Sequence, residues 1–383
     1  MSDDTFEIFL QAPPGLEPLL AEEAREKGFA MPEAVPGGVV TRGGWEDVWR
    51  ANLELRGAGR VLVRIGSFMA FHLAQLDKRA RKFPWAGLLR PGERVRVDVS
   101  CRRSKIYHAG AAKQRIETAL EAFGARIAGD TVQDDESDAE AGIEALTLKV
   151  RIEDNEVIFS LDSSGAPLHR RGTKQFVGKA PMRETLAALF LRACGYDGRE
   201  PVYDPMCGSG TFVLEAASIA TGRASGLSRG FAFERLASFD ATRWQALRDA
   251  AGGSTTPELR FAGSDRDAGA VAGANANAAR AGLGDLATFH HAAVSDATPP
   301  EGPPGLVIVN PPYGGRIGNK KLLYGLHGAL GETLRRNFKG WRVGIVTSEA
   351  GLARATGLSV TPWGPPVPHG GLKITLFTAP PIT

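Results

Sequence analysis

The pattern of hydrophobic and polar positions predicts two unlike halves. In the first 165 residues, apolar runs and amphipathic stretches follow one another in mixed order, which favours small α+β units. After Pro201, short apolar strands alternate regularly with helices. That alternation favours a parallel sheet with helices on both faces. The elements expected in the first half are strands at 6–10, 37–40, 61–65, 95–99, 146–152 and 157–161, and helices at 16–24, 47–55 and 111–123.

The second half is expected to follow a basic linker. A helix with Pro181 in its first turn is expected to run to about Cys194. Residues 222–257 are interpreted as an inserted excursion with a helix around Trp244, and residues 134–140 as an acidic solvated loop. The other expected elements are strands at 202–203, 259–262, 287–290, 306–309, 343–347 and 374–378, a helix from about 212, and a helix at 268–281.

Composition narrows the class of protein. With 383 residues, 43% of them hydrophobic and 23% charged, the chain is expected to be a soluble globular protein of two or three domains. It has no apolar run long enough to span a membrane and no apolar signal-peptide core, so a cytoplasmic location is expected. The three cysteines are far apart, and His290-His291 has no third ligand nearby, so we expect no metal.

Charge is distributed unevenly although the net charge is only +3. The segment from Lys78 to Arg115 contains twelve basic residues and two acidic ones, whereas Asp130 to Glu156 contains ten acidic and two basic residues. A solvated surface would account for a basic stretch of this kind. The same stretch would also create a field that attracts phosphates, which indicates a nucleic-acid partner.

Two short motifs follow predicted strands. Asp204-Pro205-Met206-Cys207-Gly208-Ser209-Gly210-Thr211 places Gly-x-Gly in a strand-to-helix turn, where backbone can approach a ligand closely. It lacks the full dinucleotide fingerprint and the P-loop lysine, and a tight turn alone would explain it. Asp265 ends the next strand, where a carboxylate can accept hydrogen bonds from ribose hydroxyls. A helix N-cap is the alternative for Asp265.

The third motif is the most informative. Asn310-Pro311-Pro312-Tyr313-Gly314 follows the apolar strand at 306–309, and two prolines fix a rigid backbone at the carboxyl end of that strand. An asparagine amide oxygen and nearby carbonyls can accept hydrogen bonds from a planar exocyclic amine. Tyr313 offers a ring on which a base can stack.

These three motifs, with Ser295-Asp296-Ala297, resemble those of class I S-adenosylmethionine-dependent nucleic-acid amine methyltransferases. The segments 168–172 and 180–188 narrow the resemblance to THUMP-domain RNA guanine-N2 methyltransferases of the RlmL and TrmN kind. The match is dense from about residue 160 to 350 and thinner before it. It implies a ferredoxin-like domain at 1–65, a THUMP RNA-binding domain at 66–165, a basic linker at 166–180 and a Rossmann-like methyltransferase domain at 181–383.

The resemblance also implies roles for individual residues. Asn310, Pro311, Pro312 and Tyr313 would form the catalytic group, with Asn310 and the Pro311 carbonyl gripping the guanine amine. Arg266 stands where relatives often place an apolar residue against the adenine. The S-adenosyl-L-methionine site would include Asp204, Pro205, Cys207, Gly208, Gly210, Thr211, Asp265, Arg266, Asp296 and Asn310. The RNA-binding residues would be Lys78, Arg79, Arg81, Lys82, Arg102, Arg103, Lys105, Arg170, Arg171 and Lys174.

The substrate implied is structured RNA, with 23S rRNA favoured and tRNA as the alternative. A DNA adenine or protein glutamine methyltransferase is a further alternative, because Asn-Pro-Pro-Tyr also occurs there. A non-catalytic RNA-binding adaptor is the alternative from another class, and the intact Asp204, Asp265 and Asn310 argue against it. No metal or membrane partner is expected; the oligomeric state is left open, with a monomer favoured.

Overall fold

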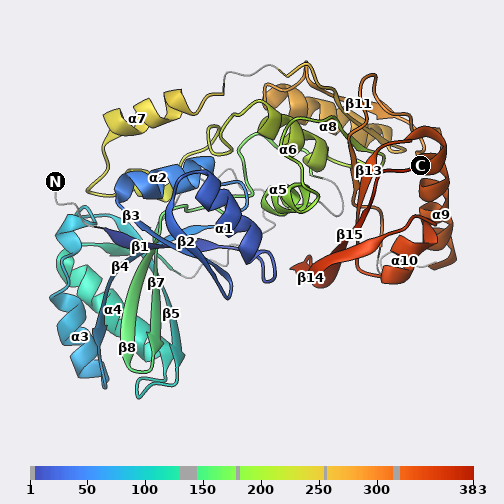
Figure 1. Cartoon of the computed structure of the whole chain (residues 1–383). Helices are drawn as coiled ribbons and strands as arrows, with labels where there is room; N and C mark the ends of the chain where they lie inside the picture. The colour runs from blue at the N-terminus through green and yellow to red at the C-terminus, as the bar shows by residue number, and fades with distance from the viewer. Residues whose placement is uncertain (1–4, 130–144, 178–181, 254–256, 314–319) are drawn as a thin grey trace.

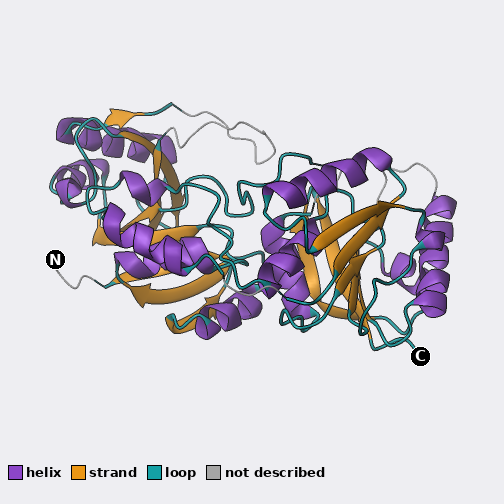
Figure 2. Ribbon diagram, turned by 90° about the horizontal axis from the view of Figure 1, so that it is seen from above, coloured by secondary structure: helices purple, strands orange, loops and turns teal. Residues whose placement is uncertain are grey.

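Two mixed β-sheets organise the protein, which is seen here as a computed structural model describing residues 5–129, 145–177, 182–253, 257–313 and 320–383 (Figure 1). The first sheet has eight strands in the order β2-β3-β1-β4-β8-β7-β5-β6, and the second has seven in the order β11-β10-β9-β12-β13-β15-β14. Seen from above, the two sheets occupy separate halves of the molecule (Figure 2).

The elements of the N-terminal half are β1 (Phe6–Gln11), α1 (Glu17–Glu26), β2 (Ala30–Val35), β3 (Gly38–Gly43), α2 (Trp45–Glu54), β4 (Val61–Met69), α3 (Leu73–Arg81), β5 (Arg94–Arg102), α4 (Ala109–Phe123), β6 (Arg126–Ile127), β7 (Leu146–Glu153) and β8 (Glu156–Asp162). The elements of the C-terminal half are α5 (Glu184–Ala193), β9 (Val202–Asp204), α6 (Thr211–Ala220), α7 (Ala241–Ala250), β10 (Phe261–Asp265), α8 (Ala268–Arg280), β11 (Ala287–His291), β12 (Leu306–Val309), α9 (Lys320–Asn337), β13 (Arg342–Thr347), α10 (Ala350–Ala355), β14 (Thr361–His369) and β15 (Leu372–Ala379).

The N-terminal sheet continues without a break across the two α+β units expected from the sequence. Strand β4 pairs with β1 on one side and with β8 on the other, both antiparallel. The domain boundary expected at residue 65 falls inside β4 (Val61–Met69). The division into a ferredoxin-like and a THUMP domain at this residue stays a prediction. Alternate side chains such as Ile8, Val63 and Phe159 are fully buried, as the period-two pattern of these strands requires.

Three elements of this half were not predicted, and one of them, β6, has only two residues. Helix α3 buries only Leu76 and Ala80, so its apolar stripe is too narrow to show as a helical period. Strand β2 buries only Pro32 and lies at the edge of the sheet, where alternation is not required.

The acidic stretch 134–140, Pro181 and Gly314 lie outside the described residues.

The C-terminal sheet is parallel over five strands, β11, β10, β9, β12 and β13. The expectation of a parallel sheet is therefore confirmed for these strands and wrong for the last one, because β15 pairs antiparallel with β13. Strand β14 pairs antiparallel with β15 and was missed because it contains four prolines. Proline lacks a backbone donor, and β14 tolerates it because it is the edge strand.

The excursion at 222–257 joins the two halves. It contains the expected helix as α7, and Figure 1 shows α7 lying over α2 of the N-terminal half. The Phe233 ring stacks on Trp49 at a centroid distance of 6.0 Å and meets Trp244 edge-on at 4.9 Å. The Phe233 N–H also donates to the Ser163 carbonyl at 3.0 Å. The insertion thus extends the core of the methyltransferase-like half onto the other domain.

No helix in the described part of the chain is long and apolar enough to cross a membrane. Within the same residues, no group of three or more histidine, cysteine or acidic side chains is arranged to hold a metal ion.

Candidate active site and domain junction

The three motifs meet at one edge of the C-terminal sheet. Asp204 ends β9, Asp265 ends β10 and Asn310 directly follows β12, and these strands are parallel neighbours. The chain runs from β9 to β10 on one side, while β12 lies on the other side of β9. That reversal is the topological switch point at which open α/β sheets form a ligand crevice, outside the carboxyl ends of the strands.

The glycine turn is fastened to β10 by two hydrogen bonds. The Cys207 N–H donates to the Ser264 carbonyl at 3.0 Å, and the Gly208 N–H donates to Oδ2 of Asp265 at 2.9 Å. Gly210 caps α6 with φ of +83°, and a side-chain Cβ there would lie 2.7 Å from the Phe289 ring. Glycine is therefore required at position 210 by both backbone conformation and space.

Gly208 differs from Gly210 in its surroundings. Its φ is +51°, but a Cβ built on it would meet no described atom within 4 Å. The backbone is thus bare on that side, and a ligand can approach the turn closely. The Asp265 carboxylate next to it also receives the Asp267 N–H at 2.9 Å, and each carboxylate oxygen keeps a lone pair for a further donor.

Burial sets the protonation of the first carboxylate. Burial raises the pKa of Asp204 to about 8, the hydrogen bond from the Met206 N–H partly opposes that rise, and the Asp265 charge adds to it. Burial also raises the pKa of the Cys207 thiol, which argues against a nucleophilic role for that cysteine. The Asp204 carboxyl is therefore protonated at neutral pH until a cationic group approaches it.

Asn310 presents an unused acceptor at the crevice. Its Oδ1 atom is buried and accepts no hydrogen bond from the residues that the structure describes. A buried carbonyl oxygen of this kind costs about 1–3 kcal/mol when it is left without a donor. Tyr313 follows two prolines, packs half-buried against the hydrophobic core, and has its pKa raised to about 12 by burial. Its hydroxyl is protonated at neutral pH.

Three further residues that were predicted to bind the cofactor differ in their exposure to solvent. Arg266 is exposed, and its carbonyl lies 3.0 Å from Nε2 of His291. Asp296 is also exposed, in the short turn Val294–Asp296 before β12, and the Ser295 hydroxyl donates to it at 3.3 Å. Thr211 is buried and receives Lys174 Nζ at 2.9 Å, so its hydroxyl faces the linker.

One residue at this site was missed by sequence reasoning. Asn277 on α8 is buried, and its Oδ1 accepts the N–H groups of Gln175 and Phe176, both at 3.2 Å. Its Nδ2 donates to the Phe176 carbonyl at 3.1 Å and to the Ser209 carbonyl at 3.2 Å. Asn277 thereby ties the linker to the glycine turn. The available signal was a polar residue on the buried face of an alanine-rich helix.

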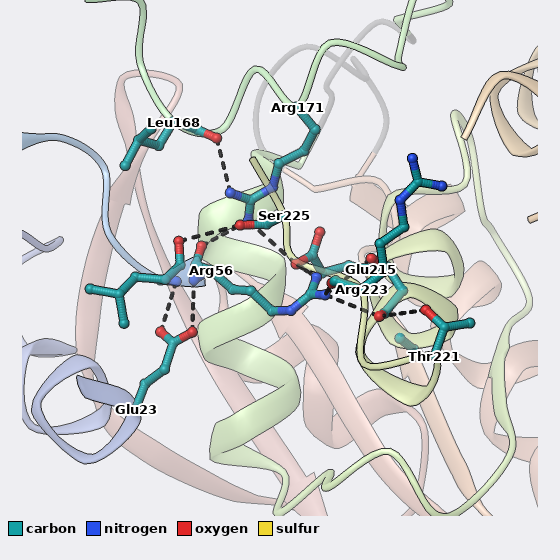
Figure 3. Close-up of polar contacts among 12 residues, drawn as sticks. Glu23, Arg56, Leu168, Arg171, Glu215, Thr221, Arg223 and Ser225 are labelled. Atoms are coloured by element: carbon teal, nitrogen blue, oxygen red, sulfur yellow. Dashed lines mark hydrogen bonds and ion pairs between the residues drawn. The ribbon is translucent and has the colours of Figure 1, made fainter. Parts of the chain in front are cut away.

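A buried ion cluster joins the halves behind the glycine turn (Figure 3). Nη1 of Arg56 lies 2.8 Å from Oε1 of Glu215, and Nη2 of Arg171 lies 3.3 Å from the same oxygen. Arg171 also donates to the carbonyls of Leu168 and Arg56 at 3.0 and 2.8 Å. Burial alone would raise the pKa of Glu215, but the two guanidinium groups outweigh it and lower that pKa.

The linker lysine is held in the same junction. Lys174 Nζ lies 3.0 Å from a carboxylate oxygen of Glu184 on α5. Arg171 and Lys174 were predicted to bind RNA, and the structure instead places both in the domain junction, where their charges are paired internally. Arg170 is half-buried beside them and has contacts of its own.

The other predicted RNA-binding residues lie on the surface of the N-terminal half. All seven are exposed, either on α3 and its C-cap or at the end of β5 and in the loop after it: Lys78, Arg79, Arg81, Lys82, Arg102, Arg103 and Lys105. Arg81 pairs with Asp77 at 3.0 Å, and Arg103 pairs with Glu153 at 2.7 Å and Asp154 at 3.1 Å. The solvent-exposed pairs among these contribute little to stability, so their basic groups remain available to phosphates.

Two family models match the chain. The model described as "RMKL-like, methyltransferase domain" matches residues 171–363, and the "RlmL ferredoxin-like domain" matches residues 7–62. A Synechocystis protein named "Putative RNA methyltransferase slr0064" is 30% identical over 374 residues, which cover 95% of this chain and 94% of that protein.

Solved structures match this chain over nearly its whole length. SMU.472, described as "a putative methyltransferase complexed with SAH", matches with a TM-score of 0.84 and 25% identity, over 100% of this chain and 99% of its own. A protein of Listeria monocytogenes described as a "predicted N6-adenine-specific DNA methylase" matches with a TM-score of 0.81 and 29% identity, over 98% and 96%. The chain therefore belongs to the RMKL-like methyltransferase family, with an RlmL-type ferredoxin-like domain preceding the methyltransferase domain.

Proposed function

We propose that this methyltransferase uses S-adenosylmethionine to methylate the exocyclic N2 amine of a guanine in structured RNA, with 23S rRNA as the favoured substrate. The observation that carries the proposal is the buried Oδ1 of Asn310 at the switch point of the sheet, which accepts no hydrogen bond from the residues that the structure describes. The RlmL-type domain at 7–62, the exposed basic residues on α3 and the name of the Synechocystis relative support RNA as the substrate class.

The residues at the sheet edge fit S-adenosylmethionine. The bare backbone at Gly208 leaves room beside the turn, and the Asp265 carboxylate has lone pairs for ribose hydroxyls. Asp204 and the turn would hold the methionine end of the cofactor. When bound, the cofactor supplies an electrophilic methyl group on a sulfonium sulfur. Asp296 would accept a hydrogen bond from the adenine amine.

Asn310 then acts on the nucleophile. A guanine amine is weakly nucleophilic because its lone pair is delocalised into the ring. The Asn310 Oδ1 atom and the Pro311 carbonyl would accept the two amine hydrogens, which localises the lone pair and aims it toward the methyl donor. Orientation of this kind contributes several kcal/mol to lowering a barrier. The rigid Pro311-Pro312 backbone keeps the acceptors in place, and the Tyr313 ring would stack on the base.

Two substrates compete with 23S rRNA. A tRNA guanine would use the same residues, and the basic surface on α3 suits either RNA. An adenine N6 amine is chemically similar, and the Listeria protein is described as a DNA methylase of that kind. The Synechocystis relative, which is named a putative RNA methyltransferase, favours RNA over DNA for this chain.

The test is methyl transfer from labelled S-adenosylmethionine to four purified substrates: unmodified 23S rRNA transcript, unmodified tRNA, double-stranded DNA and single-stranded DNA. Nucleoside mass spectrometry of each product identifies the methylated base. N2-methylguanosine in the 23S transcript is the expected result. N2-methylguanosine in tRNA alone would transfer the activity to the alternative RNA, and N6-methyladenine in DNA would overturn the proposal.

A further inference from the structure

Three loops meet at one end of the N-terminal sheet. They follow β4, follow β5, and connect β7 to β8. The Asn155 carbonyl accepts the Ala70 N–H at 2.9 Å, and its side-chain Oδ1 accepts the Lys105 N–H at 2.9 Å. The Ser104 hydroxyl in turn accepts the Asn155 N–H at 3.0 Å. These bonds hold the three loops as one surface, which we call the sheet-end surface, comprising residues 69–72, 102–108 and 153–155.

Two aromatic rings are displayed on this surface without being buried. Tyr107 is 83% exposed and Phe71 is 41% exposed. The ammonium of Lys105 lies over the Phe71 ring, 5.5 Å from its centroid. Exposed aromatic rings cost hydration free energy, and rings placed among cations are typical of surfaces that stack nucleic-acid bases. The fold itself gains no core packing from the Tyr107 ring.

The charge of the sheet-end surface suits the backbone of a nucleic acid. Arg102, Arg103 and Lys105 are exposed there. Arg103 is paired with Asp154, whose side chain is 65% exposed, and with Glu153, whose side chain is only 10% exposed. A phosphate can replace the exposed Asp154 carboxylate, because such a surface pair is weak. His72 and His108 also lie at this end, but their Nδ1 atoms accept the N–H groups of Gln75 and Ala111 as helix N-caps. The two histidines are therefore already explained, and the rings and basic side chains carry the inference.

We propose that the sheet-end surface binds unpaired nucleotides of the RNA, with bases stacked on Tyr107 and Phe71 and phosphates held by Arg102, Arg103 and Lys105. This inference rests on the proposed function and adds a second RNA-binding site to it. Unpaired nucleotides are required because the faces of bases inside a duplex are already stacked on one another. A protein partner would bury the rings equally well, but the surrounding cations favour phosphates.

The position of the surface predicts how it acts on the reaction. Figure 1 shows this end of β5, β7 and β8 directed away from the methyltransferase sheet. A nucleotide stacked there is therefore remote from the target base. Its binding energy contributes to capture of the RNA and leaves the chemical step unchanged, so losing it raises KM without changing kcat.

The experiment compares Tyr107→Ala and the double variant F71A/Y107A with two controls. Tyr107→Phe keeps the ring, and Met31→Ala removes another exposed apolar side chain, 85% exposed, on β2. The probes are a labelled single-stranded RNA and a labelled RNA duplex, each about twelve nucleotides long. Binding is measured by fluorescence anisotropy, and circular dichroism verifies that each variant is folded. Steady-state methylation of 23S transcript gives KM and kcat.

We expect Tyr107→Ala to bind the single strand about tenfold more weakly, because the variant loses the stacking of one base on an aromatic ring. The double variant should bind more weakly still, the two controls should match the wild type, and duplex affinity should not change. KM should rise in the alanine variants at constant kcat. Unchanged single-strand affinity in the folded double variant would overturn the proposal and leave a protein partner for the rings.

The two proposals fail separately. If the wild-type protein binds the single strand through Tyr107 but methylates none of the RNA substrates, the proposed function is wrong and the stacking site stands. If it methylates RNA and the double variant does so with the wild-type KM, the methyltransferase assignment stands and the stacking site is wrong.

Discussion

Nη1 of Arg56 lies 2.8 Å from Oε1 of Glu215, and this ion pair fastens the N-terminal half to the helix that begins at the glycine turn. Glu215 is one turn into α6, and its side chain is 5% exposed. Arg171 from the linker reaches the same carboxylate, so one acidic group pairs with two buried cations from separate segments. The orientation of α6, and with it the turn at 208–210, is thereby set against the other domain.

Removing the carboxylate should be costly. Glu215→Ala leaves two buried guanidinium groups without their partner, and breaking a buried pair of this kind costs about 3–5 kcal/mol of unfolding free energy. The matched control is Glu26→Ala, which breaks the ion pair with Arg192 between α1 and α5. The Glu26 side chain is 61% exposed, so this change should cost only about 1 kcal/mol. Urea denaturation of both variants checks this. Equal losses would mean that the junction depends on packing instead of on Glu215.

Asp265 is expected to support the cofactor in two ways. Asp265→Ala removes the acceptors for two ribose hydroxyls and also the acceptor for the Gly208 N–H. A hydrogen bond to a charged group contributes roughly 1.5–3 kcal/mol, so the affinity for S-adenosylmethionine should fall tenfold or more. Isothermal titration calorimetry measures the change. Asp267→Ala is the control, because that carboxylate caps α8 and should leave affinity nearly unaltered; unchanged affinity of the Asp265 variant would remove this residue from the site.

The sheet edge was predictable because local chemistry dictates it. A strand followed by Gly-x-Gly, by an acid, or by Pro-Pro ends for reasons visible within a few residues, and the three ends meet because the strands are parallel neighbours. The positions of Asp204, Asp265 and Asn310 were accordingly expected before the fold was seen.

The junction was not predictable in the same way. Arg171 and Lys174 lie in a run of basic residues, and sequence alone gives no reason to separate them from Arg170 as internal. Glu215, the partner of Arg171, lies 44 residues further along the chain, and no local pattern links the two. Lys174 pairs instead with Glu184 on α5. Strand β14 was not predicted for a different reason. Its prolines are disfavoured in a central strand but tolerated in an edge strand.

The basic residues of α3 should contribute to RNA affinity through counterion release. Replacing Lys78, Arg79 and Lys82 by alanine should weaken binding and reduce the slope of log K against log salt, by roughly 0.7–0.9 for each phosphate that is no longer neutralised. The charge-matched control replaces Arg199, Lys339 and Lys373, which are exposed in the C-terminal half. Binding is measured by filter retention over a series of salt concentrations. If both triple variants show the same slope as the wild type, the bases of α3 are only a solvated surface.

Asp204 should make stability depend on pH. Its pKa is raised from 3.8 to about 8, and burial is the main cause. The folded protein therefore retains a proton that the unfolded chain releases. The contribution of Asp204 is therefore greatest below about pH 4 and is lost as pH rises to about 8. Asp204→Asn should abolish that loss, and the variant should gain stability relative to the wild type from about pH 5 to pH 8. Urea denaturation across this range checks it; a constant difference would mean that Asp204 is ionised in the folded state.

Substitution of Asn310 should separate the methyl-transfer step from the binding of the cofactor. Asn310→Ala removes an amine acceptor but leaves the glycine turn and Asp265 in place, so turnover should fall about a hundredfold or more while cofactor affinity changes little. Asn310→Asp keeps an acceptor at the same position and should retain more of the rate. Tyr313→Ala should instead weaken capture of the base by roughly 1–3 kcal/mol, and Tyr313→Phe should not. Single-turnover methyl transfer at saturating RNA, measured beside a cofactor titration, distinguishes these effects. Near-normal transfer by Asn310→Ala would show that another group holds the amine, because the unpartnered Oδ1 would then have no part in the reaction.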